Sequence, residues 1–224
     1  MITYLLNFTL CSALLLLGYH LLLKSKTMFV FNRLYLLFSI VFSLGVPFAV
    51  VKYSTLPVQT VPPVTEEIQI LQNNNVPAVA PVAANTAPAK SQFNYLYYIA
   101  VVVYAVITLL LLFRFVRNLN IIRLSVLNNK RASYKGAQLV LIEDELTPHT
   151  FLNYIFLNKE SYLANHIERD ILSHELTHAR QYHTADVIFI ELVQVFCWFN
   201  PFTWLYKKAI QLNHEFIADA AVLD

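Results

Sequence analysis

The chain has 224 residues, of which 57% are hydrophobic and only 13% are charged. This composition is too apolar for a soluble domain of that size and favours a protein whose main solvent is the lipid bilayer. The formal net charge of +2 does not indicate nucleic-acid binding, so we expect no nucleic-acid partner.

The first two apolar runs predict a transmembrane helical hairpin over residues 1–52. They extend from Thr3 to Leu23 and from Leu34 to Val51. Each is long enough to cross a hydrocarbon core of about 30 Å at a rise of about 1.5 Å per residue. No Lys or Arg precedes the first run and no small-residue cleavage site follows it. We therefore expect the first run to remain as a membrane helix rather than to be removed as a signal peptide.

A segment rich in Pro and Ala separates this hairpin from a third apolar run. Residues 53–93 contain almost no basic charge, and their composition is typical of a flexible extramembrane loop. The third run, from Asn94 to Phe113, predicts a transmembrane helix over residues 94–115.

The basic residues predict how these helices are oriented. Three of them flank the turn of the hairpin: Lys24, Lys26 and Arg33. Six more lie between Arg114 and Lys135, after the third helix. Cytoplasmic loops of membrane proteins carry an excess of Lys and Arg. We therefore expect the N-terminus and the 53–93 loop outside the cell, and the segment after Arg114 inside it.

Residues 116–224 change in character and predict an α+β domain. The runs Ala137–Ile142 and Tyr154–Leu157 are rich in β-branched or aromatic residues, which is typical of two or three strands of a small sheet. From about Asn165 the apolar residues recur at three- and four-residue spacing, which predicts a helix. This helix carries the motif HELTH at residues 174–178.

The HELTH motif predicts a catalytic zinc site. His174 and His178 are four residues apart, so both imidazoles project from one face of the helix and can bind one Zn²⁺. Glu175 follows the first histidine and is placed to take a proton from a zinc-bound water, which would then attack a peptide carbonyl. The motif also arises by chance, so the prediction needs a third ligand.

Two arrangements of residues could supply the third ligand. In one, a further His follows His178 by six residues with a Gly between them, but Gln181 and Thr184 occupy these positions. In the other, a later helix supplies a carboxylate, and Glu215 is followed four residues later by Asp219 on the same helical face. We predict that Glu215 binds the metal and that Asp219 accepts a hydrogen bond from the far nitrogen of a ligand histidine.

The segment from Arg114 to Asp224 resembles the peptidase core of the BlaR/MecR-type sensor-transducers, the integral-membrane zinc endopeptidases of bacterial antibiotic-resistance signalling. The resemblance rests on HELTH, on the pair Asn200-Pro201 followed by Trp204, and on the motif EFIAD at residues 215–219. No penicillin-binding module is present in the chain, so β-lactam sensing is not expected of it.

This resemblance implies a mainly α, polytopic membrane protein with three transmembrane helices and a gluzincin-like α+β zinc peptidase domain. In that family His174, His178 and Glu215 would bind zinc, and Glu175 would be the catalytic base. The substrate would be a protein or peptide, such as a cytoplasmic repressor or the receptor itself. The site would face the cytoplasm in a bacterial inner membrane, and a homodimer is a further expectation.

The apolar stretch from Ala185 to Tyr206 is long enough for a fourth transmembrane helix, but we predict that it does not cross the membrane. A single crossing would deliver Glu215 to the opposite face of the bilayer from the HELTH motif. Pro201 interrupts the run, because proline removes a helix hydrogen bond and restricts the residue before it. We therefore expect a membrane-dipping hairpin over residues 185–206.

Several roles stay open from the sequence. A constitutive quality-control or prenyl-protein-type membrane endopeptidase fits the same motifs, and so does a catalytically silent receptor or scaffold, although a structural zinc site has no use for Glu175. His183 and Asp186 fit either support of the metal ligands or a helix end at the membrane surface. We expect His214 on the surface, with an oxyanion-binding role as the alternative. The strand over residues 154–157 fits either edge addition of a substrate or a position inside a closed sheet.

Overall fold

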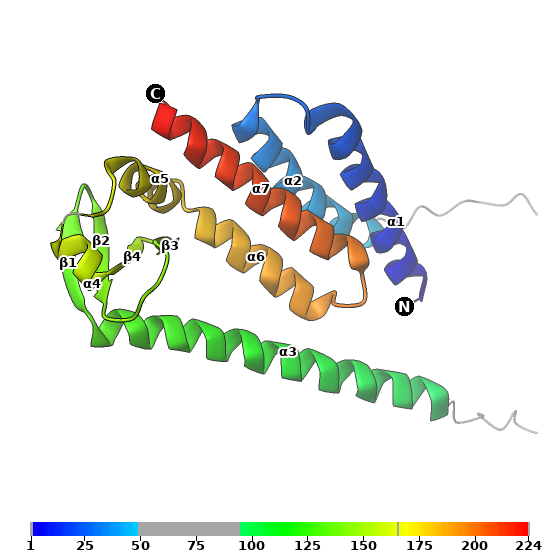
Figure 1. Ribbon diagram of the computed structural model, residues 1–224. Helices are drawn as coiled ribbons and strands as arrows, with labels where there is room; N and C mark the ends of the chain where they lie inside the picture. Colours follow the sequence, from blue (N-terminus) through cyan, green and yellow to red (C-terminus); the bar gives the residue numbers. More distant parts are fainter. Residues whose placement is uncertain (1, 49–94, 165, 224) are drawn as a thin grey trace, which may run out of the picture.

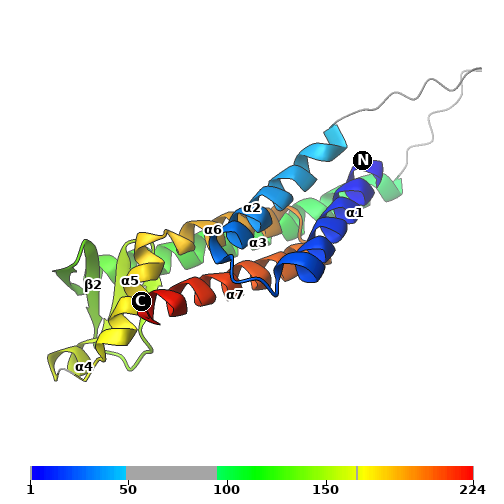
Figure 2. The ribbon, with the colours of Figure 1, turned by 90° about the horizontal axis from the view of Figure 1, so that it is seen from above.

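The computed structural model describes residues 2–48, 95–164 and 166–223, and the predicted 53–93 loop lies outside these ranges. The described part of the chain is mainly helical and contains a small mixed sheet. It is elongated, with the sheet near one end and the N-terminus near the other (Figure 2). Three of its helices are long and apolar enough to cross a membrane, as the sequence predicted.

The first two of these helices form the N-terminal hairpin. Helix α1 (Ile2–Gly18) continues into a short π-helix, η1 (Tyr19–Leu23), and α2 (Phe29–Gly45) continues into a 3₁₀ turn, η2 (Val46–Phe48). Helix α2 begins at Phe29, several residues before the apolar run that predicted it. The basic residue Arg33 therefore lies within the first turns of a membrane helix rather than in the connecting turn.

The third candidate membrane helix, α3 (Tyr95–Asn128), has 34 residues. At about 1.5 Å per residue it is roughly 50 Å long, well beyond the thickness of a bilayer core of about 30 Å. The segment predicted as the membrane helix, residues 94–115, corresponds only to its first part. The rest stays helical because Leu and Arg favour helices and no Gly or Pro interrupts them. Helix α3 runs along α6 (His183–Phe196) and leads into the sheet (Figure 1).

The sheet has four strands in the order β1-β2-β4-β3, so the prediction of two or three strands was wrong. The strands are β1 (Lys130–Tyr134), β2 (Ala137–Ile142), β3 (His149–Phe151) and β4 (Tyr154–Asn158). The two apolar runs form the central parallel pair β2 and β4, and the polar or short edge strands pair with them antiparallel. Because β4 is paired on both sides, a substrate cannot add to it, and β3 is the edge strand instead.

Helix α5 (Arg169–Arg180) follows the short helix α4 (Lys159–Leu163) and packs on the sheet. Its Leu172, Leu176 and Ala179 are buried against sheet residues that include Leu139, Ile155 and Leu157. Full burial of one Leu side chain contributes about 1.5–3 kcal/mol. The three-and-four spacing thus fixes which face of α5 meets the sheet, and the histidines of HELTH lie on the part of α5 that faces away from it.

Helices α6 and α7 (Pro201–Leu223) form an antiparallel pair, and the chain breaks between them where Asn200-Pro201 predicted a break. Asn200 is fully buried, and its side chain donates to Ser12 Oγ of α1 at 3.0 Å and accepts from the backbone N–H of Phe202 at 3.0 Å. Helix α7 packs on α2 and α6 through a shared apolar cluster that includes Ile40, Ile190 and Ile210. This packing returns the end of α7 to the level of α5 (Figure 1).

Candidate metal centre

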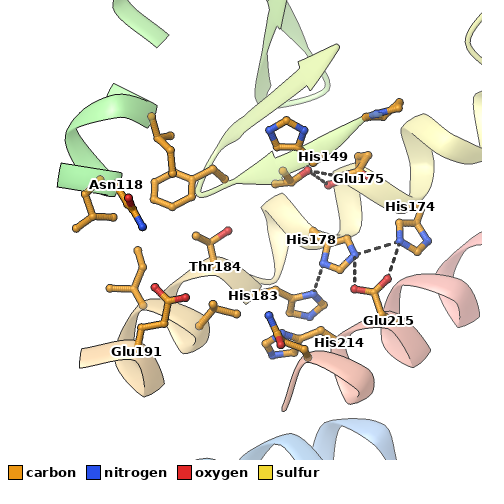
Figure 3. Close-up of a pocket in the computed structure, with 18 of the residues that line it drawn as sticks. Asn118, His149, His174, Glu175, His178, His183, Thr184, Glu191, His214 and Glu215 are labelled. Atoms are coloured by element: carbon orange, nitrogen blue, oxygen red, sulfur yellow. Dashed lines mark hydrogen bonds and ion pairs between the residues drawn. The ribbon is translucent and has the colours of Figure 1, made fainter. Parts of the chain in front are cut away.

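Helix α5 presents the two histidines of HELTH side by side. The Nε2 atoms of His174 and His178 are 3.1 Å apart, and both side chains are partly buried. Their spacing of one helical turn explains the approach, because residues four apart lie above each other on a helix. Both rings turn toward α7, as Figure 3 shows.

Helix α7 brings a carboxylate to the same point. Glu215 Oε2 lies 3.4 Å from Nε2 of His174, and Oε1 lies 3.8 Å from Nε2 of His178. One donor atom from each of the three residues lies within 4.8 Å of the others. The site therefore depends on the packing of α7 against α5, which joins two distant parts of the sequence.

These distances match the donor spacing of a zinc site. Two ligand atoms bound at about 2.0–2.1 Å to a tetrahedral ion lie about 3.4 Å from each other. The observed separations of 3.1, 3.4 and 3.8 Å lie on both sides of this value. Two imidazoles and one carboxylate are also a donor set of catalytic zinc sites, which keep a fourth position open. The residues therefore fit a zinc ion.

Asp219, one turn beyond Glu215 on α7, contacts His174 of α5. Its Oδ1 atom lies 3.1 Å from Nδ1 of His174. A proton on Nδ1 that is donated to this carboxylate leaves the lone pair of Nε2 free for a metal. The four-residue spacing of Glu215 and Asp219 places one carboxylate on each nitrogen of the same ring.

His183 plays the corresponding part for His178. The Nδ1 atoms of the two rings are 2.9 Å apart, so one of them donates and the other accepts. If Nε2 of His178 faces the metal, its Nδ1 carries the proton and His183 is the acceptor. His183 is suited to accept, because burial and the neighbouring His214 lower its pKa to about 3 and keep it neutral. Burial also lowers the pKa of His178.

His214 lies behind this pair and is only 2% exposed, so the prediction of a surface position was wrong. Its ring stacks on that of His183 at a centroid distance of 4.1 Å. Its Nε2 atom donates to Asp186 Oδ2 at 2.9 Å, so this nitrogen is already occupied by a carboxylate. Burial raises the pKa of Asp186, but hydrogen bonds from His214 and Arg33 and the charge of Arg33 outweigh it and lower the pKa overall.

Glu175 points into a cavity of about 570 Å³ that the three proposed ligands also line. It is buried, and its Oε2 accepts a hydrogen bond of 2.7 Å from the hydroxyl of Thr150 on β3. The opposite wall comes from α3 and includes Phe115 and Asn118. Strand β3, which the sequence did not predict, thus holds the Glu175 carboxylate near His174 and His178.

The model of the protein family described as BlaR1 peptidase M56 matches residues 11–224 of the chain. The chain belongs to the BlaR1 peptidase M56 family. It is therefore a member of a family of membrane metallopeptidases, and its candidate membrane helices agree with this class. No protein with a curated description matches the chain.

In this M56 chain, the structure brings together all five residues that the sequence singled out at the site: His174, Glu175, His178, Glu215 and Asp219. It also places His183 and Asp186 behind the histidines rather than at an exposed helix end. Sequence reasoning missed Thr150 and gave Arg33 only a topological role. Neither residue belongs to a spacing pattern, because each reaches the site from an element distant in the chain.

Proposed function

We propose that the chain is a membrane-embedded zinc endopeptidase with a gluzincin-like catalytic domain. His174, His178 and Glu215 hold Zn²⁺, and Glu175 is the catalytic base. The observation that carries this proposal is the convergence of three donor atoms from α5 and α7 in the cavity that contains the Glu175 carboxylate. We further propose that the protein lies in the bacterial inner membrane with this cavity on the cytoplasmic side.

The residues of the cavity divide the chemistry of peptide hydrolysis among them. A bound Zn²⁺ would polarise the substrate carbonyl and lower the pKa of a water molecule. Glu175 takes a proton from the attacking water and passes it to the leaving amine. Thr150 holds this carboxylate in place through the 2.7 Å hydrogen bond. Asp219 and His183 fix the orientation of the two imidazoles.

Strand β3 is suited to hold an extended substrate. It pairs with β4 on one side, and no described strand pairs with its other edge. Its residues His149, Thr150 and Phe151 line the cavity. An extended peptide that adds to such an edge gains backbone hydrogen bonds and runs past the residues below it. We therefore place the scissile bond between β3 and α5.

The biological role that we propose is regulated proteolysis, with a cytoplasmic repressor or a membrane-associated protein as the substrate. The proposal is supported by family membership and by the cavity wall that α3, a candidate membrane helix, provides. A purely structural zinc site has no use for a base such as Glu175, which lines the same cavity as the proposed ligands.

The full chain, purified in detergent, tests the catalytic proposal. We expect one Zn²⁺ per chain, and we expect Glu175→Gln to retain it while cleavage falls by about 10²–10⁴-fold. The matched control is Glu145→Gln, an exposed carboxylate outside the cavity, which should cleave like the wild type. A folded protein without zinc, or a Glu175→Gln variant with normal cleavage, would refute the assignment.

A second arm tests the biological role. The chain is co-expressed with a transcriptional repressor encoded beside its gene, and in parallel with a misfolded membrane protein. Regulated proteolysis predicts that the repressor is cut in the wild type and remains intact with Glu175→Gln. Cleavage of the misfolded protein alone would instead establish constitutive quality control.

A further inference from the structure

The membrane hairpin contributes one side chain to the surroundings of the metal centre. Arg33, in the first turns of α2, forms an ion pair with Asp186 through Nε and donates from Nη2 to the backbone oxygen of Gln181 at 2.9 Å. Gln181 caps the C-terminal end of α5, and Asp186 lies in the first turn of α6. One guanidinium thus joins a membrane helix to the junction between α5 and α6.

From this junction a series of contacts reaches both ligand-bearing helices. Asp186 accepts the hydrogen bond of His214, which is the neighbour of Glu215 on α7. His214 stacks on His183, and His183 contacts Nδ1 of His178 on α5. These rings lie directly behind the proposed ligands (Figure 3). A displacement of Asp186 would therefore act on α5 and α7 together.

The chemistry of this position favours arginine. A guanidinium is planar and can donate to two acceptors in fixed directions, whereas an ammonium is a compact point charge. Its two acceptors are a carboxylate and a carbonyl at the end of a helix, where the helix dipole attracts a cation. The Arg33 and Asp186 side chains are only 18% and 11% exposed, so the loss of either partner leaves a charge that water screens poorly. Lys26, in the turn that precedes α2, is exposed.

We propose that Arg33 is a positioning residue of the metal centre. It clamps α2 to the α5–α6 junction. Through Asp186, His214 and His183, this clamp fixes the positions of His178 and Glu215. The inference rests on the proposed function for its account of the metal. On this proposal the membrane hairpin helps to position the metal ligands in addition to anchoring the protein in the membrane.

Metal binding by the full chain in detergent tests the proposal. We expect Arg33→Gln to weaken zinc affinity in competition with a chelator by up to about 10–100-fold, the loss found for direct partners of a ligand, because Arg33 acts through intervening residues. The visible absorption spectrum of the Co²⁺-loaded protein should change with it. Arg33→Lys should lie between Arg33→Gln and the wild type, and the control Lys26→Gln should match the wild type in both measurements.

The double variant Arg33→Gln/Asp186→Asn separates one connected clamp from two independent contacts. Residues of one network are not additive, so its loss of affinity should be close to that of the more affected single variant. A lower thermal midpoint with unchanged zinc affinity and an unchanged Co²⁺ spectrum would show a merely structural role and overturn the proposal. Fully additive losses would overturn it as well.

A measurement on the metal-free protein keeps this inference separate from the proposed function. Hydrogen exchange of the backbone amides over residues 178–187 should be faster in Arg33→Gln than in the wild type or in Lys26→Gln. Unchanged exchange would refute the clamp whatever the metal does. If the wild type binds no zinc, the proposed function fails, and the exchange measurement still decides whether Arg33 holds the α5–α6 junction.

Discussion

The two proposed ligand histidines are supported in different ways. His174 has the carboxylate of Asp219 behind its Nδ1, whereas His178 has the neutral ring of His183. A carboxylate partner raises the basicity of an imidazole ligand more than a neutral acceptor does, and both kinds of partner orient the ring. The two proposed ligands thus differ, because one has a carboxylate behind it and the other depends for its placement on a buried network. Substitutions behind the two rings should differ in effect for this reason.

At the residue scale, Thr150 gives the most direct test of how the base is held. Hydrogen bonds to charged groups contribute about 1.5–3 kcal/mol, which corresponds to about 10–100-fold in rate. We expect Thr150→Val to lower kcat by this amount with one zinc still bound, because only the hydroxyl near Glu175 is lost. Thr150→Ser keeps the hydroxyl and should keep most of the rate. Equal activity of all three proteins would show that the contact has no part in catalysis.

Asp186 predicts a pH dependence of stability. Its pKa in the folded protein lies below the ordinary value of 3.8, so the unfolded chain binds the proton more tightly. The stabilisation is therefore fully present above pH 3.8 and is lost as the pH falls below it. We expect the gap in thermal midpoint between wild type and Asp186→Asn, both metal-free, to be constant from pH 7 to about pH 5 and to shrink toward pH 3. A gap that is the same at pH 3 as at pH 7 would contradict this account.

The residues that the sequence identified and those that it missed differ in a physical way. Two histidines four apart, or Glu215 and Asp219 four apart, meet because one helix holds both. Such pairs can be read from spacing alone. Thr150 and His214 meet their partners only through packing of separate elements, and no local pattern encodes that. The expected surface position of His214 failed for this reason.

At the element scale, the turn before α7 decides where Glu215 arrives. Asn200 accepts the backbone N–H of Phe202 in the manner of a helix cap and also ties the turn to α1 through Ser12. Loss of a capping side chain costs about 1 kcal/mol. We expect Asn200→Ala to lower the thermal midpoint in detergent, while the exposed control Lys208→Ala leaves it unchanged. An Asn200→Ala variant as stable as the control would show that Pro201 alone sets the turn.

Elements were predictable where one strong signal dominated. Apolar length predicted α1, α2 and the membrane part of α3, and β-branched runs predicted the central strands β2 and β4. The edge strands escaped because β1 is polar and β3 has only three residues, so their pairing comes from the neighbouring strands. The start of α2 was missed because Asn32 and Arg33 interrupt its apolar run, although both side chains have hydrogen-bond partners in the folded chain.

At the scale of the whole molecule, the length of α6 limits how deeply the pair formed by α6 and α7 can enter a membrane. Helix α6 has 14 residues. At about 1.5 Å per residue it spans roughly 21 Å, less than a bilayer core of about 30 Å. Helix α7 then runs back antiparallel to it and brings Glu215 to His174 (Figure 1). A shallow entry into the membrane is compatible with the site, and a full crossing is not.

This geometry predicts that α5 and the C-terminal end of α7 lie on the same side of the membrane. In a chain without its native cysteines, Asp170→Cys and Ala221→Cys introduce exposed thiols on α5 and α7. We expect an impermeant maleimide to label both from the same face of sealed vesicles, and a cysteine in the 53–93 loop from the other face. Labelling of the two sites from opposite faces would place Glu215 across the bilayer from the histidines. A ligand must lie within about 2 Å of the ion, so that result would exclude Glu215 from the metal centre.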